Sequence, residues 1–192
     1  MTGHKARPLT GTSPTAYRRS VSTQTTHAAA ARKPPVEYIP RITAQYIGLG
    51  YGEYRWVHSE TPPPWTPLTK PISECRVGLI ATGGGYVAGQ TAFHYRDDTT
   101  YRAIPTDVDT SQLRATHFAY DLTDARSDIN CVFPIEALRT LRDSGEIGEL
   151  GPNAYTLMGG IYSTRRVHEE LIPELAKRCV ADELDVVLLV PV

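Results

Sequence analysis

The chain has 192 residues, of which 41% are hydrophobic, and a formal net charge of -1 at pH 7. This is enough to bury one sizeable core, so we expect one domain plus a tail. Positions 1–35 hold six basic residues and no acid, which leaves 14 basic against 21 acidic residues in the rest of the chain. An acidic body disfavours nucleic-acid binding. No run of about 18 apolar residues exists that would predict a membrane span.

The cysteines Cys75, Cys131 and Cys179 form no CxxC pair and show no metal-ligand spacing. An odd number of cysteines without a secretory signal favours reduced thiols in a cytosolic protein over a disulfide framework. We therefore predict a cytoplasmic protein without a structural metal.

Two segments precede the expected core. Residues 1–35, rich in Thr, Ser, Ala and Arg, are typical of a disordered basic tail; a transit peptide is the alternative, but no clear amphipathic period supports it. Residues 36–72 are rich in Tyr and Pro, with four prolines between Pro62 and Pro67. Such a run cannot continue a helix, so we expect an extended arm. It would cover its own domain or a second subunit, or serve as a peptide ligand for a partner domain.

An α/β core is expected over residues 73–192. The apolar stretch Arg76–Ala81 predicts a strand, and it runs directly into Thr82-Gly83-Gly84-Gly85. Glycines permit positive φ and let backbone N–H groups approach a phosphate or carboxylate closely. Because neither GxGxxG nor GxxxxGK is present, a tight turn without a ligand explains the glycines equally well.

Charged residues dominate the next segments. Asp97 and Asp98, flanked by Arg96 and Arg102, would point to opposite faces of a strand, which favours a solvated, salt-bridged edge over a joint site. Residues 115–120 predict a further strand that carries His117. The loop after it supplies three aspartates, so that His117 has the potential metal ligands Asp121, Asp124 and Asp128 nearby. Aspartates in loops are more often turn formers and helix caps, and we favour that interpretation.

The last third of the chain predicts helix, strand, helix and strand. Pro134 and Gly145 delimit a helix over residues 134–142, and residues 154–158 form a strand. Cys131, before that helix, is interpreted as a buried structural thiol rather than a nucleophile. A helix over residues 164–181 buries Cys179 in the core and is kinked by Pro173. The apolar run Asp185–Val192 then adds a parallel strand by a right-handed crossover.

The expected fold is therefore α/β, an open and mostly parallel sheet with flanking helices of the Rossmann or flavodoxin type, whose last covering helix is missing. Ligands of such sheets collect beyond the carboxyl ends of the strands. The substrate-pocket candidates are the residues around the points where strands should end: Gly83, Gly84, Gly85, His117, Asp121, Met158 and Gly159. Replacing His117 or Asp121 by Ala should lower ligand binding without unfolding the protein.

The sequence also resembles a known family. The resemblance rests on Pro63–Pro71, Val77–Gly84, Asp128–Pro134, Gly145–Gly148 and Met158–Gly160, which follow in order the pattern of the glycine/betaine/sarcosine/D-proline reductase selenoprotein B family. It covers about residues 36–192 and leaves the tail out. It implies an oxidoreductase subunit that reductively cleaves a carbon–nitrogen bond in a small amine or amino acid, with a thiol electron donor and other reductase subunits or a second copy as partners.

The resemblance implies that, in relatives, a selenocysteine or cysteine follows the strand that corresponds to Val186–Val192. A second cysteine lies near it. None of the three cysteines falls at that position, so no catalytic residue is carried over. We expect the redox residue just after Val192, at a UGA codon read as stop; a genuine truncation is the alternative. No bound cofactor is expected beyond a selenocysteine there, and the 192-residue chain would be inactive.

Two functional interpretations follow. In the first, the protein is a selenol- or dithiol-dependent reductase subunit. In the second, it is a non-catalytic ligand-binding or scaffolding subunit whose Tyr/Pro-rich arm holds a partner. An uncovered last strand would also leave apolar surface in water, so we expect the isolated chain to be poorly soluble or marginally folded.

Overall fold

The computed structural model describes residues 36–53 and 58–192, so the prediction for the 1–35 tail lies outside the described residues. Internal contacts divide the chain into two units, Met1–Pro62 and Pro63–Val192. Each unit is described by itself below.

The first unit contains helix α1, Tyr38–Gly48. Our expectation of an extended arm was wrong for these residues. Pro40 falls in the first turn of α1, where a missing N–H breaks no intrahelical hydrogen bond, and Ile39, Ile42 and Tyr46 recur at helical spacing.

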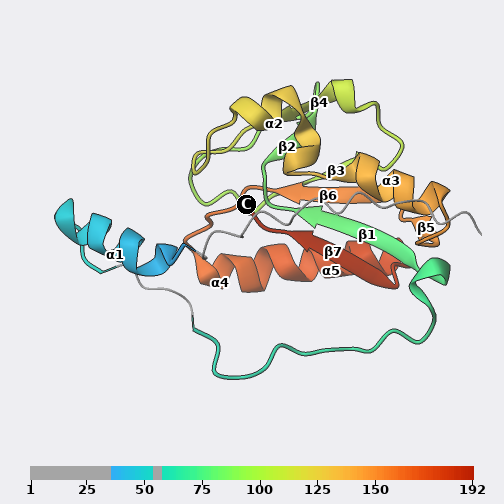
Figure 1. Ribbon diagram of the computed structural model, residues 1–192, viewed down its shortest axis with the longest axis horizontal. Helices are drawn as coiled ribbons and strands as arrows, with labels where there is room; N and C mark the ends of the chain where they lie inside the picture. Colours follow the sequence, from blue (N-terminus) through green and yellow to red (C-terminus); the bar gives the residue numbers. More distant parts are fainter. Residues whose placement is uncertain (1–35, 54–57) are drawn as a thin grey trace, which may run out of the picture. The chain divides into compact units, whose positions relative to one another are not determined.

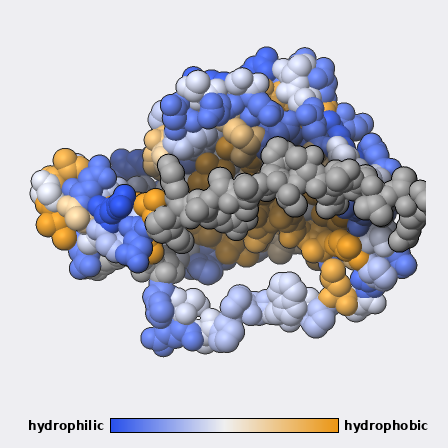
Figure 2. All heavy atoms as spheres, in the orientation of Figure 1, coloured by the Kyte–Doolittle hydropathy of each residue, from blue (hydrophilic) through white to orange (hydrophobic). Residues whose placement is uncertain are grey.

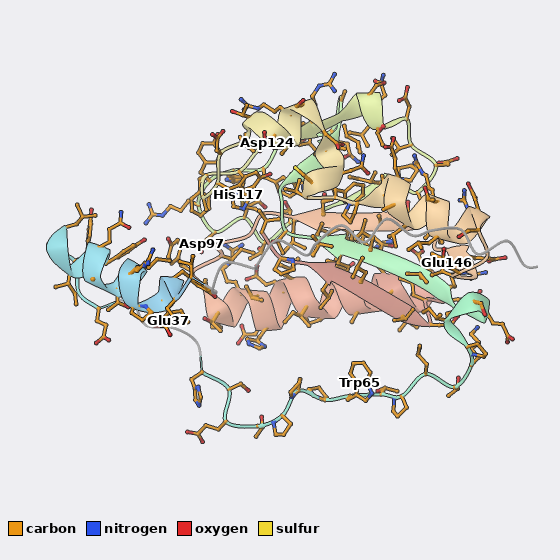
Figure 3. The ribbon with its side chains drawn as sticks, in the orientation of Figure 1. Glu37, Trp65, Asp97, His117, Asp124 and Glu146 are labelled. Carbon is orange, nitrogen blue, oxygen red and sulfur yellow. The ribbon has the colours of Figure 1, made fainter. Side chains whose placement is uncertain are left out.

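Residues 58–71 carry no helix or strand, as the prolines predict, and Trp65 on this segment is 84% exposed (Figure 3). This aromatic side chain therefore does not pack over its own domain.

The second unit is built on a five-stranded mixed sheet (Figure 1). Its strands are β1 (Arg76–Ala81), β3 (Tyr101–Pro105), β5 (Glu149–Leu150), β6 (Asn153–Leu157) and β7 (Val186–Val190). Strand β1 pairs parallel with β7 over the register Val77–Val186 to Ala81–Val190. On its other side β1 pairs parallel with β5 at its start and with β6 at its end, and β3 closes that edge antiparallel to β6. The sheet is thus mostly parallel, as predicted.

Helices cover both faces of this sheet (Figure 1). Alternate strand residues point to opposite faces. Val77, Leu79 and Ala81 pack in one cluster with Ile135 and Leu138 of helix α3, Ile135–Asp143. On the other face, Leu171 and Leu175 pack on Tyr155, Leu157 and Ile80. The α/β class predicted from the sequence is confirmed.

The helical segment after β6 contains the irregularity that Pro173 predicts. It consists of α4 (Thr164–Arg166), a π-helical turn η4 (Val167–Leu171) and α5 (Ile172–Ala181), with Pro173 in the first turn of α5. In a regular helix the ring of Pro173 would clash with the carbonyl one turn earlier. The π turn ends just before this proline. Cys179 is only half-buried here, which corrects its placement in the core.

A two-stranded antiparallel ribbon lies above the sheet in Figure 1. It pairs β2 (Gly85–Val87) with β4 (Leu113–Ala115), and the 3₁₀ turn η2 (Thr110–Gln112) precedes β4. Helix α2 (Thr123–Ser127) and the turn η3 (Ile129–Cys131) follow, and η1 (Ile72–Glu74) leads into β1. His117 therefore lies in the loop after β4 rather than in a strand.

The segment before β3 also differs from expectation. Residues 92–100 are loop, and Asp98 is 3% exposed instead of forming a solvated edge. Its carboxylate accepts the N–H groups of His94 and Thr100, both at 2.9 Å. Asp97, at φ +48°, accepts the N–H of Tyr162 at 2.7 Å. The two aspartates do not converge, as the sequence indicated, but each fixes a different loop.

Among the described residues, no helix is long and apolar enough to cross a membrane.

Candidate ligand site at the carboxyl edge of the sheet

The ends of three parallel strands meet around Thr82. Its N–H donates to the Val190 carbonyl at 3.0 Å, and its own carbonyl accepts the N–H of Gly159 at 3.0 Å. Its hydroxyl accepts the N–H of Val192 at 2.8 Å. Thr82 follows β1 directly, Gly159 follows β6 and Val192 follows β7, so the backbone itself brings these ends together. This is the edge at which ligands of open α/β sheets bind.

The glycines after β1 allow two loops to approach each other closely. Gly84 has φ +68°, and a Cβ there would collide with the carbonyl oxygen of Thr116. The same glycine accepts the N–H of Thr116 at 3.0 Å. A Cβ on Gly83 would lie 2.8 Å from Val132 Cβ. Gly85 begins β2 and pairs with Ala115. These contacts explain the three glycines by packing, and they hold the loop of His117 over the carboxyl edge.

His117 is the polar side chain buried at this edge. It is 4% exposed, and Figure 3 shows it, like Asp97, at the end of the sheet where β1 and β6 finish, with Glu146 at the opposite end. Its Nδ1 accepts the N–H of Ala119 at 3.0 Å. Its Nε2 is buried and has no hydrogen-bond partner among the described residues. A Cβ on Gly159 would lie 3.2 Å from this Nε2 and 3.4 Å from the Thr82 carbonyl oxygen, so any side chain at this position would crowd the nitrogen.

Burial lowers the pKa of His117, and the nearby Thr82 carbonyl opposes this shift without cancelling it. The ring is therefore neutral near pH 7. Because Nδ1 accepts a hydrogen bond, the proton of the neutral ring belongs on Nε2. The site consequently presents a buried, uncharged N–H donor beside Gly159.

Aromatic rings hold His117 in this orientation. Phe118 stacks on it with ring centroids 5.4 Å apart and an interplanar angle of 10°, and the Tyr120 ring lies 4.7 Å away. The Tyr120 hydroxyl donates to the Gly83 carbonyl at 2.7 Å. Sequence reasoning missed Thr82 and Tyr120. The position of Thr82 directly after a buried strand was a signal for it, whereas nothing in the local sequence pairs Tyr120 with Gly83.

The remaining substrate-pocket candidates fall into two groups, one at the site and one outside it. Met158 is 1% exposed and forms an isolated bridge with Gly83, so it belongs to the floor of the site. Asp121 is exposed, and its carboxylate accepts the N–H and hydroxyl of Thr123 at 2.9 and 2.7 Å, which lowers its pKa. Asp128 likewise accepts the Asn130 N–H. These contacts are the turn and cap roles we favoured, and no group of three potential metal ligands exists among the described residues.

The three thiols, all within the described ranges, differ in burial and surroundings. Cys75 is fully buried, with Sγ 3.3 Å from the Pro71 carbonyl. Cys131 is exposed, which corrects our expectation of a buried thiol; partial desolvation by its neighbours, followed by the charges of Asp128 and Asp124, raises its pKa. Burial and Asp182 raise the pKa of Cys179. A catalytic thiol needs the opposite shift, because the thiolate is the nucleophile.

These features define an α/β protein whose candidate ligand position lies at the carboxyl edge of a mostly parallel sheet. Residues 52–192 match the family model of glycine/sarcosine/betaine reductase selenoprotein B. The chain belongs to this family, which confirms the resemblance seen in its sequence.

Two curated relatives are similar over much of the chain. The D-proline reductase subunit gamma of Acetoanaerobium sticklandii is 37% identical over 130 residues, which cover 67% of this chain and 54% of the relative. The glycine reductase complex component B subunit gamma of Symbiobacterium thermophilum is 27% identical over 146 residues, or 71% of this chain and 33% of the relative. The chain thus spans about half or less of these relatives. No solved structure matches it.

Proposed function

We propose that the protein is a subunit of a selenol- or dithiol-dependent reductase that cleaves a carbon–nitrogen bond in a small amine or amino acid. The observation that carries the proposal is the Nε2 of His117, buried at the carboxyl edge in a chain of this family: it makes no hydrogen bond of regular geometry among the described residues, although the Thr82 carbonyl lies near the ring. A buried donor without a partner costs about 1–3 kcal/mol, which a ligand acceptor would recover. Glycine, betaine, sarcosine and D-proline all offer a carboxylate oxygen as that acceptor.

The chain's own residues would bind and orient this substrate. The neutral Nε2–H of His117 would donate to one carboxylate oxygen, and Gly159 places no side chain against this nitrogen. Since His117 is fixed by the Ala119 N–H and by Phe118, the donor is pre-oriented and loses little entropy on binding. This binding role requires no change of protonation near pH 7.

The redox group is proposed to come from outside the residues of this chain, because the pKa of Cys131 and of Cys179 is raised and Cys75 is fully buried. A selenolate or thiolate with a second thiol would supply the two electrons: its bond to carbon would form as the C–N bond breaks and the amine leaves. Attack by the second thiol would then form a dichalcogenide, and the carbon would leave with the electron pair and take up a proton. An external dithiol would reduce the dichalcogenide. We place this selenocysteine or cysteine in further sequence or in another subunit. We also propose a cytoplasmic location for the protein.

The second candidate is a non-catalytic ligand-binding or scaffolding subunit, and the unactivated thiols favour it for the chain of 21.2 kDa taken alone. The two candidates differ in redox chemistry but share the His117 site. An intact mass of the native protein well above 21.2 kDa, with a selenocysteine or a cysteine pair in the extra sequence, would support the reductase.

Binding is the direct test of the site. Glycine, sarcosine, betaine and D-proline would be titrated into the chain by calorimetry, and the one that binds compared in His117→Gln and His94→Gln. His94 has a 70% exposed side chain and serves as the matched control. We expect at least about tenfold weaker binding for His117→Gln, equivalent to about 1.4 kcal/mol, and no change for His94→Gln. Equal binding by both variants, at unchanged circular dichroism, would contradict the site.

A further inference from the structure

Strand β7 has an apolar and unprotected edge. Its sequence, Val186–Val190, contains no charge and no proline, and its only strand partner among the described residues is β1. Soluble proteins usually shield a sheet edge with lysines, prolines, bulges or a covering element. Leu188 is 41% exposed and Leu189 65% exposed, although the register of β7 with β1 points them to opposite faces. Both faces of this edge strand are therefore incompletely covered.

A groove lies beside β7 on the face of α5. Its volume is about 550 Å³, and it is lined by Ile80 and Leu189 of the sheet and by Leu171, Leu175, Ala176 and Cys179 of the helical segment. Leu171 and Leu175 cover Tyr155 and Leu157 of β6, so the helix sits over the middle of the sheet and leaves β7 uncovered. Figure 2 shows hydrophobic residues gathered over the region where Figure 1 places β7 and α5.

These two features form one surface, which we call the β7 surface: the free edge of Val186–Val190 and the groove between β7 and α5. We propose that the β7 surface binds a parallel β-strand followed by an amphipathic helix, and that this unit corresponds to the part of the D-proline reductase subunit gamma that the chain does not cover. The strand would pair with the free edge of β7, and the helix would fill the groove beside Leu189.

The chemistry of the surface selects this occupant. An open parallel edge pairs by backbone hydrogen bonds with another strand, and in parallel sheets the connection to the next strand is a helix that lies on the sheet face. The matched region accounts for 54% of the D-proline reductase subunit, so that relative has the polypeptide to supply such a unit. The β7 surface lies beside Val192, whose N–H is bound to Thr82 at the candidate site. A unit docked there would extend the carboxyl edge of the sheet.

Two other occupants are less suited. A second copy of this chain related by a two-fold axis would pair β7 with β7 antiparallel and would supply no helix for the groove. Helix α1 exposes apolar side chains, with Leu49 after its end 65% exposed, but it offers no strand for the free edge. Both become distinguishable outcomes of the experiment.

The probe is a separate polypeptide made of the residues of the Acetoanaerobium sticklandii subunit that lie beyond its match to this chain, mixed with the full 192-residue chain. Hydrogen exchange read by mass spectrometry on the peptide that contains β7 reports pairing of its edge. We expect at least about tenfold slower exchange of Val186–Val190 amides with the probe, which corresponds to about 1.4 kcal/mol of protection. This readout is independent of substrate binding and of reductase activity.

The variants make the result specific. Leu189→Lys should abolish the protection, because a lysine in the groove opposes burial of the helix. Leu49→Lys is the matched control, since Leu49 has the same 65% exposure, and should leave the protection intact. Absence of protection in the wild-type chain, or equal protection in Leu189→Lys, overturns the proposal. Protection of the β7 amides in the absence of the probe also overturns the proposal. If that protection increases with chain concentration, a second copy of the chain covers the β7 surface. If it is lost in Leu49→Lys, helix α1 covers it.

Discussion

The backbone N–H of Val192 donates to the hydroxyl of Thr82 at 2.8 Å. This contact joins the residue that follows β1 to the polypeptide just beyond β7, at the edge where His117 keeps an unpartnered donor. It also places the Val192 side chain 3.4 Å from where a Cβ on Gly83 would lie. Val192 is therefore held beside the candidate ligand site.

Replacing Thr82 by Val should release this contact while keeping the side chain's shape. The Val192 amide would then exchange about fivefold faster, because a hydrogen bond of this kind contributes about 1 kcal/mol. Exchange measured by NMR on the Val192 amide tests the expectation. Thr82→Ser keeps the hydroxyl and should restore slow exchange; if Ser behaves like Val, the hydroxyl is not the anchor.

Gly84→Ala should destabilise the protein more than Gly89→Ala. Both glycines have positive φ, +68° and +96°, so each substitution carries a backbone cost of about 1–2 kcal/mol. Only at Gly84 would the new Cβ collide with the Thr116 carbonyl, whereas nothing lies within 4 Å at Gly89. Urea unfolding should therefore show a loss at least about 2 kcal/mol larger for Gly84→Ala. Equal losses would mean that the two loops separate easily.

Sequence patterns predicted the central sheet and α3 because these segments have a clear period and clear ends. Strand β1 is a short apolar run, and α3 lies between Pro134 and Gly145, whose φ of +74° shows the left-handed cap. Helix α1 was missed because the prolines that follow it dominated the interpretation, although Pro40 at a helix start is tolerated. Sequence patterns therefore predicted a helix or strand correctly where the residues of that segment alone determine it.

The candidate site was less predictable, because it depends on contacts between distant segments. His117 was selected for the position expected after a strand, but its burial comes from Phe118, Tyr120 and the closely packed glycine loop. Asp121 was selected on the same ground, and its carboxylate instead holds Thr123. Sequence alone shows which residues follow strands. It does not show which of them face the sheet edge.

Asp121→Ala should therefore act on local stability rather than on ligand binding, contrary to the expectation drawn from the sequence. Losing its hydrogen bonds to Thr123 should lower the free energy of unfolding by about 1 kcal/mol, the usual net contribution of such a turn-forming hydrogen bond. Asp107→Ala, which removes an exposed carboxylate in the loop after β3, is the control. Weaker binding of the amino-acid ligand in Asp121→Ala, with an unchanged unfolding curve, would return Asp121 to the site.

The buried His117 should make stability depend on pH. Its pKa is lowered in the folded state by burial, so that below the ordinary value of 6.5 the unfolded chain takes up the proton first. The free energy of unfolding should be fully present above pH 6.5 and decline as the pH falls toward the folded-state pKa. In His117→Gln this part of the decline should disappear, which urea unfolding at pH 7.5, 6 and 5 would detect. An identical slope in both proteins would show that His117 is accessible to protons in the native state.

The three thiols should react in an order that reflects burial rather than catalysis. Cys131 is exposed, Cys179 half-buried and Cys75 fully buried, so a maleimide should label them in that order, with Cys75 modified only after unfolding. Because the pKa of Cys131 is raised above 9.0, its labelling rate should still be rising with pH at pH 9. Cys131→Ser should remove the fastest phase. A fast phase already at its maximum near pH 7 would reveal an activated thiolate within this chain, and the redox group would then not have to come from elsewhere.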